Sequence, residues 1–242
     1  MSWADRLAQA ARRGKGPLRH ARTVWRWMLA FRLPVIRPIH GLLYAEWSMR
    51  PTYWPLLLKV LYREPLLRYR CTRLGRRLRM SGALPMIIGD GRIELGDDVT
   101  LDDSNTWNVG FKVSTDAQLI IGNRVFVGDH VLFSAAKSIT IGDDTMIAGR
   151  TSIFDNVSHP LSPARRLRGE SFSLDECEPV VIGRNVWIGT QCFILKGVTI
   201  GDNSVVAAGS VVTRSVPPNT LAAGSPAKVV REIGDEVSEP AG

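Results

Sequence analysis

β-Branched aliphatic residues recur every six positions in the C-terminal part of the chain. The longest run has six members without a miss: Ile182, Ile188, Ile194, Ile200, Val206 and Val212. An amphipathic helix repeats its apolar positions about every 3.6 residues and a half-buried strand every 2, so neither fits this period. A fixed period of six indicates a β-solenoid, in which short strands turn corners and each side of a coil contributes one inward aliphatic residue.

The same period occurs earlier, so about half of the protein is repeat. The earlier members are Leu95 and Leu101, then Ile121, Val127 and Phe133, and, after a two-residue phase slip, Ile141, Ile147 and Ile153. We therefore expect a mainly β protein with the solenoid over residues 86–214. Residues 161–179 are too polar and irregular to continue the period, and we expect them to loop out of the coil, where such excursions commonly build a site.

The two ends of the chain lack the six-residue period. Residues 1–85 predict an α-helical extension, with helices over 17–31, 39–49 and 53–79 separated by prolines. Residues 215–242 form a cap and tail, in which Pro217 and Pro218 end the repeat. The sequence KVVREI over 228–233 predicts a short helix that covers the open last coil, whose backbone groups would otherwise be unpaired.

The net charge of +8 hides a division between the two parts of the chain. Residues 1–85 hold 18 of the 31 Lys and Arg and 3 of the 23 Asp and Glu, which gives +15 and leaves −7 for the remainder. Five of the seven tryptophans also lie here: Trp3, Trp25, Trp27, Trp47 and Trp54. Basic and aromatic residues together suggest an anionic membrane surface. A helical subdomain that packs its tryptophans on the solenoid or on a partner is the alternative, and no motif supports nucleic acid.

Cysteine usage and the N-terminal sequence bear on the compartment. Cys71, Cys177 and Cys192 have no paired or metal-ligand spacing, so we expect reduced structural thiols. We see no cleavable signal sequence, and arginines interrupt the most apolar early region, so we expect no membrane span. The expectation is a cytoplasmic protein, at the inner face of the cell membrane if the extension binds lipid.

The sequence VWIGTQCFILKGVTIGDNSVVAAGSVVTRSVPPNTLAAGSPAKVVREI, with DNVSHP upstream, resembles the hexapeptide-repeat acyltransferases. The resemblance covers about residues 85–233 and is closest to the maltose, galactoside and polysaccharide O-acetyltransferases. It implies a left-handed parallel β-helix, a homotrimer, and acetyl-CoA bound in the groove between neighbouring subunits.

The resemblance also implies the catalytic residues. His159, in DNVSHP, matches the family's general base, and an imidazole can accept the proton of a sugar hydroxyl that attacks a thioester. Asp155 matches the residue that orients this imidazole, although Val157 departs from the usual pattern. His130 matches a substrate-contacting position. The zinc-dependent γ-class carbonic anhydrases of similar fold need three histidine ligands, which the repeats lack, so we expect no metal.

The positions matching the family's acetyl-CoA site lie downstream. They are Trp187, Gly189 and Thr190 along the pantetheine groove, with Gly189 leaving room for close approach, Ala208, Thr213 and Arg214 near the pantetheine amides and phosphate, and Lys228 and Arg231 near the adenosine and its phosphates.

The sequence thus favours an acetyl-CoA-dependent O-acetyltransferase acting on a saccharide or cell-envelope glycan intermediate. Two alternatives remain open. One is a non-catalytic, membrane-associated solenoid scaffold. The other is an acyltransferase with an amine acceptor, either a sugar amine or a xenobiotic.

Overall fold

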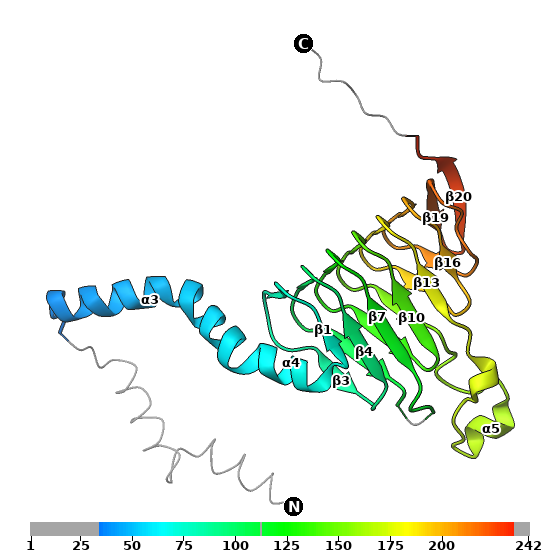
Figure 1. The fold of residues 1–242 in the computed structure, drawn as a ribbon, viewed down its shortest axis with the longest axis horizontal. Coiled ribbons are helices and arrows are strands. Elements are labelled where there is room, and N and C mark those ends of the chain that lie inside the picture. Colours follow the sequence, from blue (N-terminus) through cyan, green and yellow to red (C-terminus); the bar gives the residue numbers. More distant parts are fainter. Residues whose placement is uncertain (1–33, 112, 235–242) are drawn as a thin grey trace, which may run out of the picture. The chain divides into compact units, whose positions relative to one another are not determined.

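A computed structural model describes residues 34–111 and 113–234 (Figure 1). The chain divides into two units, Met1–Pro51 and Thr52–Gly242. The predicted helix over 17–31, which includes Trp25 and Trp27, lies outside the described residues, and so does Trp3. The first described helix is α3 (Arg37–Leu58), followed by a π-helical turn, η1 (Lys59–Arg63), and α4 (Glu64–Arg70). Among the described helices, none combines the length and the apolar character that crossing a membrane requires.

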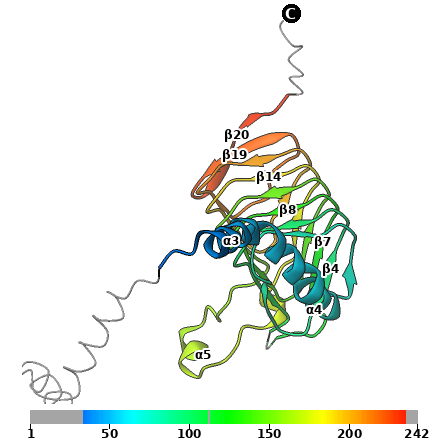
Figure 2. The same cartoon turned by 90° about the vertical axis from the view of Figure 1, so that its left-hand side faces the viewer.

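Three sheets form the sides of a coiled prism, and their strands are parallel except for the last strand of sheet B. Sheet A consists of β1 (Arg73–Leu74), β4 (Arg92–Leu95), β7 (Gln118–Ile121), β10 (Ser138–Ile141), β13 (Val180–Ile182) and β16 (Thr199–Ile200). Sheet B consists of β2 (Arg79–Met80), β5 (Thr100–Leu101), β8 (Phe126–Val127), β11 (Met146–Ile147), β14 (Trp187–Ile188), β17 (Val205–Val206), β19 (Thr220–Gly224) and β20 (Ala227–Glu232). Sheet C consists of β3 (Met86–Ile88), β6 (Thr106–Val109), β9 (Leu132–Ala135), β12 (Ser152–Phe154), β15 (Phe193–Ile194) and β18 (Val211–Val212). The chain visits A, B and C in turn, and Figure 2 shows the resulting stack of coils.

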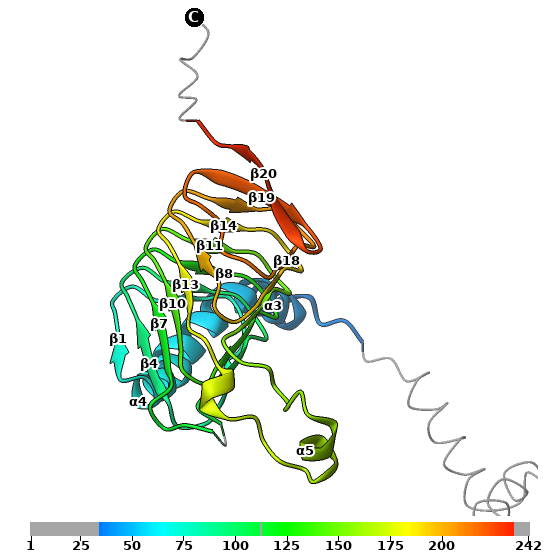
Figure 3. The same cartoon turned by 90° about the vertical axis from the view of Figure 1, so that its right-hand side faces the viewer.

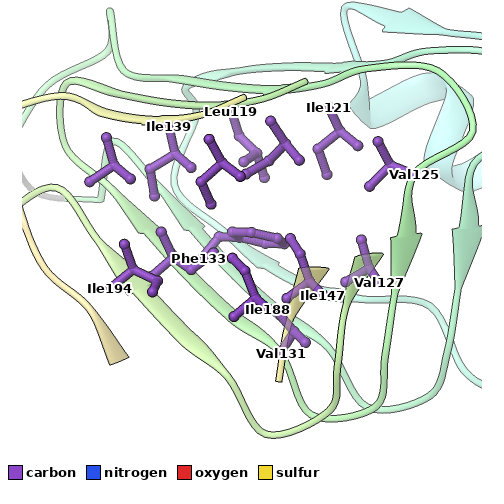
Figure 4. Packing of buried hydrophobic residues seen from close by; sticks show 14 of the residues in the cluster. Leu119, Ile121, Val125, Val127, Val131, Phe133, Ile139, Ile147, Ile188 and Ile194 are labelled. Carbon is purple, nitrogen blue, oxygen red and sulfur yellow. The ribbon is translucent and has the colours of Figure 1, made fainter. Parts of the chain in front are cut away.

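The six-residue period marks the core of the prism, as predicted. Every member of the longest run is at most 1% exposed, and so are the earlier members from Leu95 to Ile153. Figure 4 shows Leu119, Ile121 and Ile139 facing Phe133, Ile147 and Ile188 across the interior. These side chains fill the prism because each strand turns one aliphatic residue inward and the next outward.

Trp107, six positions after Leu101, also belongs to the core. The sequence pattern did not include it because the pattern was drawn from aliphatic residues and tryptophan is aromatic. Its side chain is fully buried, and its ring meets that of Phe133 edge-on, with ring centroids 6.3 Å apart and planes 67° apart. β6 and β9 pair at these two residues, so the aromatic contact continues the aliphatic stack.

The solenoid begins earlier than residue 86, and the preceding helix ends earlier than residue 79. Both predictions were wrong because the backbone from Arg73 onward is already paired, with Arg73 opposite Glu94 and Leu74 opposite Leu95. Leu67 of α4 is 1% exposed and joins the core cluster. The Arg70 guanidinium donates to the carbonyls of Gly89 at 2.5 Å and Gly91 at 3.1 Å, which ties α4 to the coil.

The predicted C-terminal capping helix is also wrong, because residues 227–232 form the strand β20. β20 pairs antiparallel with β19 and lies at the edge of sheet B. Val229 and Val230 are β-branched and favour extended backbone. The pairing also satisfies the backbone N–H and C=O groups along the edge of β19, which would stay unpaired if residues 227–232 formed a helix.

Candidate functional site

A pocket of about 300 Å³ lies where sheet C ends and the chain bends towards sheet A. Its walls come from the ends of β6, β9 and β12 and from the excursion that follows β12. The lining residues are Asn108, Phe111, Val113, Ser134, Ala135, Ala136, Asn156, Ser158, His159, Gly169, Glu170, Ser171 and Phe172. His159, the predicted general base, therefore lines a pocket with the excursion loop.

The excursion over 161–179 leaves the coil as predicted and has its own internal order (Figure 3). It contains α5 (Pro163–Leu167) and a 3-10 turn, η2 (Leu174–Glu176). The Arg165 guanidinium binds Glu170 at 3.1 Å, Glu176 at 3.0 Å and the Ser171 carbonyl at 2.9 Å. These contacts hold the segment that contributes Glu170 to Phe172 to the pocket.

A tight turn presents the His159 imidazole to the pocket. The Asn156 side-chain oxygen accepts from the Ser158 backbone N–H at 3.0 Å, and Ser158 has a φ of +61°. The His159 backbone N–H then donates to the Val157 carbonyl at 2.6 Å. The imidazole is exposed and hydrogen-bonds no other described residue, so both of its ring nitrogens are open to a ligand in the pocket.

Asp155 is fully buried and binds the pocket wall. Its carboxylate accepts from the backbone N–H of Ala136 at 2.7 Å and of Lys137 at 2.6 Å, and from the Asn156 side-chain amide at 3.0 Å. Within the described residues no hydrogen bond joins it to the imidazole. Its orientation of His159 stays a prediction, whereas its hold on the bend at 136–137 is a contact of this structure.

That bend is also the cause of the phase slip seen in the sequence. After Phe133, β9 continues to Ala135 and two further residues turn the chain into β10. The slip thus signalled a pocket wall, Ser134 to Ala136, that sequence analysis did not identify. Asn108 and Phe172, on other walls, carried no comparable signal.

His130 lies on another edge of the prism, between sheets B and C. It has a φ of +54°, and its Nδ1 is 2.9 Å from the Asp129 carboxylate. It does not line the His159 pocket. Within one chain, the structure does not bring these two predicted residues together.

The residues predicted along the pantetheine groove gather on this same B–C edge. Trp187, in β14, is 51% exposed. Thr190 and Ala208 are exposed at the same corner of successive coils, where the Gly209 N–H donates to the Thr190 carbonyl at 2.9 Å. A Cβ on Gly189 would lie 2.5 Å from the Ala208 backbone nitrogen, so the close approach at this glycine is made by the next coil.

The four basic or polar positions further downstream fall in two places. Lys228 and Arg231 are exposed on β20, at the edge of sheet B. Thr213 and Arg214 are exposed just after β18, on the C–A side, where His159 also lies two coils earlier. The residues predicted to bind acetyl-CoA are therefore divided between two parts of the prism: sheet B with its B–C edge, and the C–A edge.

The described residues hold no grouped metal ligands and no exposed thiol. Over residues 34–111 and 113–234, no three His, Cys, Asp or Glu side chains are grouped to hold a metal ion. All three cysteines are buried and unpaired. Burial raises the pKa of Cys71 to about 12 and that of Cys177 to about 11, so these two are protonated at neutral pH.

Comparison with known proteins connects this geometry to a family. Residues 179–214 match the family model described as bacterial transferase hexapeptide (six repeats). The chain is 41% identical over 122 residues to galactoside O-acetyltransferase of Escherichia coli, covering 50% of this chain and 58% of that protein. It is 33% identical over 156 residues to the E. coli protein WbbJ, named for O-acetyl transfer in lipopolysaccharide biosynthesis, covering 62% and 76%.

A solved structure matches over a larger part of the chain. It is the hexapeptide-repeat acetyltransferase VCA0836 of Vibrio cholerae in complex with acetyl-CoA, with 32% identity and a TM-score of 0.50, covering 72% of this chain and 77% of that one. Three of the curated relatives are matched over 58%, 60% and 53% of their own length.

Proposed function

Because the chain belongs to the hexapeptide-repeat acyltransferases, we propose that it transfers the acetyl group of acetyl-CoA to a hydroxyl of a saccharide or cell-envelope glycan intermediate. The observation that carries the proposal is the position of His159, exposed in a pocket of about 300 Å³ beside the excursion loop. Relatives above 30% identity that are named for O-acetyl transfer favour a hydroxyl over an amine acceptor.

The proposed reaction needs one proton acceptor and no covalent enzyme intermediate. The neutral imidazole of His159 takes the proton of the acceptor hydroxyl while the hydroxyl oxygen attacks the thioester carbonyl. Backbone N–H groups stabilise the tetrahedral oxyanion. The carbon–sulfur bond then breaks, and the departing thiolate takes the proton from the imidazolium. The products are an O-acetyl ester and CoA with a free thiol.

A homotrimer with left-handed coils is part of this proposal. His159 lies on the C–A edge, whereas Trp187, Thr190 and Ala208 lie at sheet B or on the B–C edge of the same prism. An acetyl group held by Trp187, Thr190 and Ala208 of one subunit would meet the His159 imidazole of a neighbouring subunit if the B–C edge of the first faced the C–A edge of the second. The division of the residues between two edges thus favours a shared groove.

Substitution of His159→Asn tests the proposal. Asparagine keeps a polar side chain but cannot act as a base, so turnover should fall by roughly 10²–10⁴-fold. Thiol release from acetyl-CoA would be followed with a panel of nitrophenyl glycosides and glucosamine as acceptors, and CoA affinity by calorimetry on the same preparation. We expect CoA affinity to be unchanged.

His40→Asn, in α3, is the matched control, since it makes the same change away from the pocket. Near-normal turnover of a folded His159→Asn protein would remove this residue from the mechanism. Absence of CoA binding by the wild-type protein would favour the scaffold instead. Acetylation of glucosamine at nitrogen, in preference to hydroxyls, would favour the amine acceptor.

A further inference from the structure

The first unit exposes a row of large apolar side chains on α3. Ile39, Leu43 and Trp47 follow one another at intervals of four residues, which places them on one face of the helix. Their exposed fractions are 53%, 55% and 61%. Tyr44 is also exposed, and its ring lies 5.7 Å from that of Trp47. Large apolar side chains grouped in this way mark a surface that binds another molecule.

The second unit repeats the pattern where its helical segment begins. Trp54, Leu57 and Leu61 are spaced by three and four residues and are 53%, 45% and 74% exposed. Tyr62 and Tyr69 are 60% and 91% exposed. None of these five residues belongs to the buried core cluster. Each unit therefore has an apolar and aromatic helical surface of its own.

The net charge of residues 34–70 favours an anionic partner. Residues 34–70 hold six Lys and Arg and two Asp and Glu, which gives +4, within an extension that totals +15. Tryptophan and tyrosine gather at membrane interfaces because one part of the ring system is apolar and another hydrogen-bonds with water, and lysine and arginine bind anionic headgroups. The extensions of two copies would repel each other, since both are strongly positive.

From these observations we infer that both helical surfaces, that of Ile39, Leu43, Tyr44 and Trp47 and that of Trp54, Leu57, Leu61, Tyr62 and Tyr69, bind an anionic lipid bilayer. The apolar side chains enter the headgroup region while the basic side chains contact the lipid charges. The inference is independent of the acceptor chemistry, and it locates the enzyme at a membrane surface. The rival partner is a second copy of the chain, whose residues 86–242 carry a net charge of −7.

Vesicle co-sedimentation of the full chain tests the inference. The probes are vesicles of phosphatidylcholine alone and of phosphatidylcholine with phosphatidylglycerol. We expect binding only to the second, and binding that weakens between about 0.1 M and about 1 M salt, where the screening length falls from about 10 to 3 Å. The double variant Trp47→Ala, Trp54→Ala should bind these vesicles at least roughly tenfold more weakly, because two large apolar side chains no longer enter the bilayer.

Trp187→Ala is the matched control, since it removes a half-exposed tryptophan from the solenoid and should leave vesicle binding unchanged. Calorimetry with CoA shows that the double variant is folded. Equal binding to both vesicle types, or unchanged binding by the double variant, would overturn the inference. A smaller sedimenting mass of the double variant in the absence of vesicles would assign the surface to another copy of the chain.

Discussion

Trp187 and Arg231 lie in one row across sheet B. Trp187 pairs with Val205, Val205 with Leu221, and Leu221 with Arg231. Directly paired residues project from the same face of a sheet, so the indole and the guanidinium both belong to the outer face. Three strand spacings separate them, roughly 14 Å. Such a row suits an extended ligand with an apolar or amide-bearing part near Trp187 and a phosphate near Arg231.

Arg231→Gln should therefore weaken CoA binding by about tenfold, since one charge-assisted hydrogen bond is worth roughly 1.5–3 kcal/mol and exposure to solvent places it at the low end. Calorimetry gives the dissociation constant. The control is Arg184→Gln, which removes an equally charged and exposed side chain from the A–B edge, where it pairs with Asp202 at 2.9 Å. An equal loss in both variants would mean that only overall charge matters.

Asp155→Asn should destabilise the protein and disturb the pocket wall. The new amide would place N–H groups against a backbone donor at Ala136 or Lys137, and a buried polar group left unsatisfied costs about 1–3 kcal/mol. We expect a lower Tm and a higher KM for the acceptor, because Ala136 lines the pocket. Asp116→Asn, which makes the same change at an exposed position, is the control.

If Asp155 instead acts by orienting the imidazole, the same variant would lose turnover while the acceptor KM and the Tm stayed near wild type. Thermal unfolding and steady-state kinetics on one preparation separate the two roles.

The corner between sheets A and B should contribute a pH-dependent part of the stability. Hydrogen bonds from the Asn123 side chain at 3.0 Å and backbone at 2.8 Å lower the pKa of Asp143 below its ordinary value of 3.8. A lowered folded-state pKa stabilises the protein above about pH 4, and this contribution disappears as the pH falls through the folded-state value.

Asp143→Asn should accordingly lower the Tm at pH 7, and the difference from wild type should shrink below pH 4. Scanning calorimetry at pH 7 and at pH 3 measures this difference in Tm. A difference that stays constant between pH 7 and pH 3 would contradict the assigned role of the carboxylate.

The core could be predicted from the sequence because the prism interior is narrow and repetitive. Each side of a coil turns at least one aliphatic side chain inward at a fixed place, so Ile188 or Ile200 is fixed by its interval from the previous member. Trp107 obeyed the same interval but not the residue type, and only the structure showed it to be part of the stack.

The ends and the pocket could not be predicted in the same way, because contacts outside the six-residue period decide them. Lys228 to Ile233 are too few to show a period, and pairing with the free edge of β19 determined that residues 227–232 form a strand. The pocket walls come from Asn108, Ala136 and Phe172, which only the path of the chain brings together. His159 could be singled out because its motif is local, and the structure places it in the pocket lining, while its role as the base stays a prediction.

The excursion that contributes Glu170 to Phe172 leaves and re-enters the coil without breaking the register of its neighbours. β12 and β15, on either side of it, still pair at Ile153 and Ile194. The side-chain hydrogen bonds of residues 163–172 stay within residues 160–176, so we expect changes in the length or sequence of this stretch to leave the stack and the B–C edge intact. Under the proposed function this stretch is an exchangeable module of the pocket: it can change acceptor preference while Trp187, Thr190 and Ala208, which would hold the acyl donor, stay where they are.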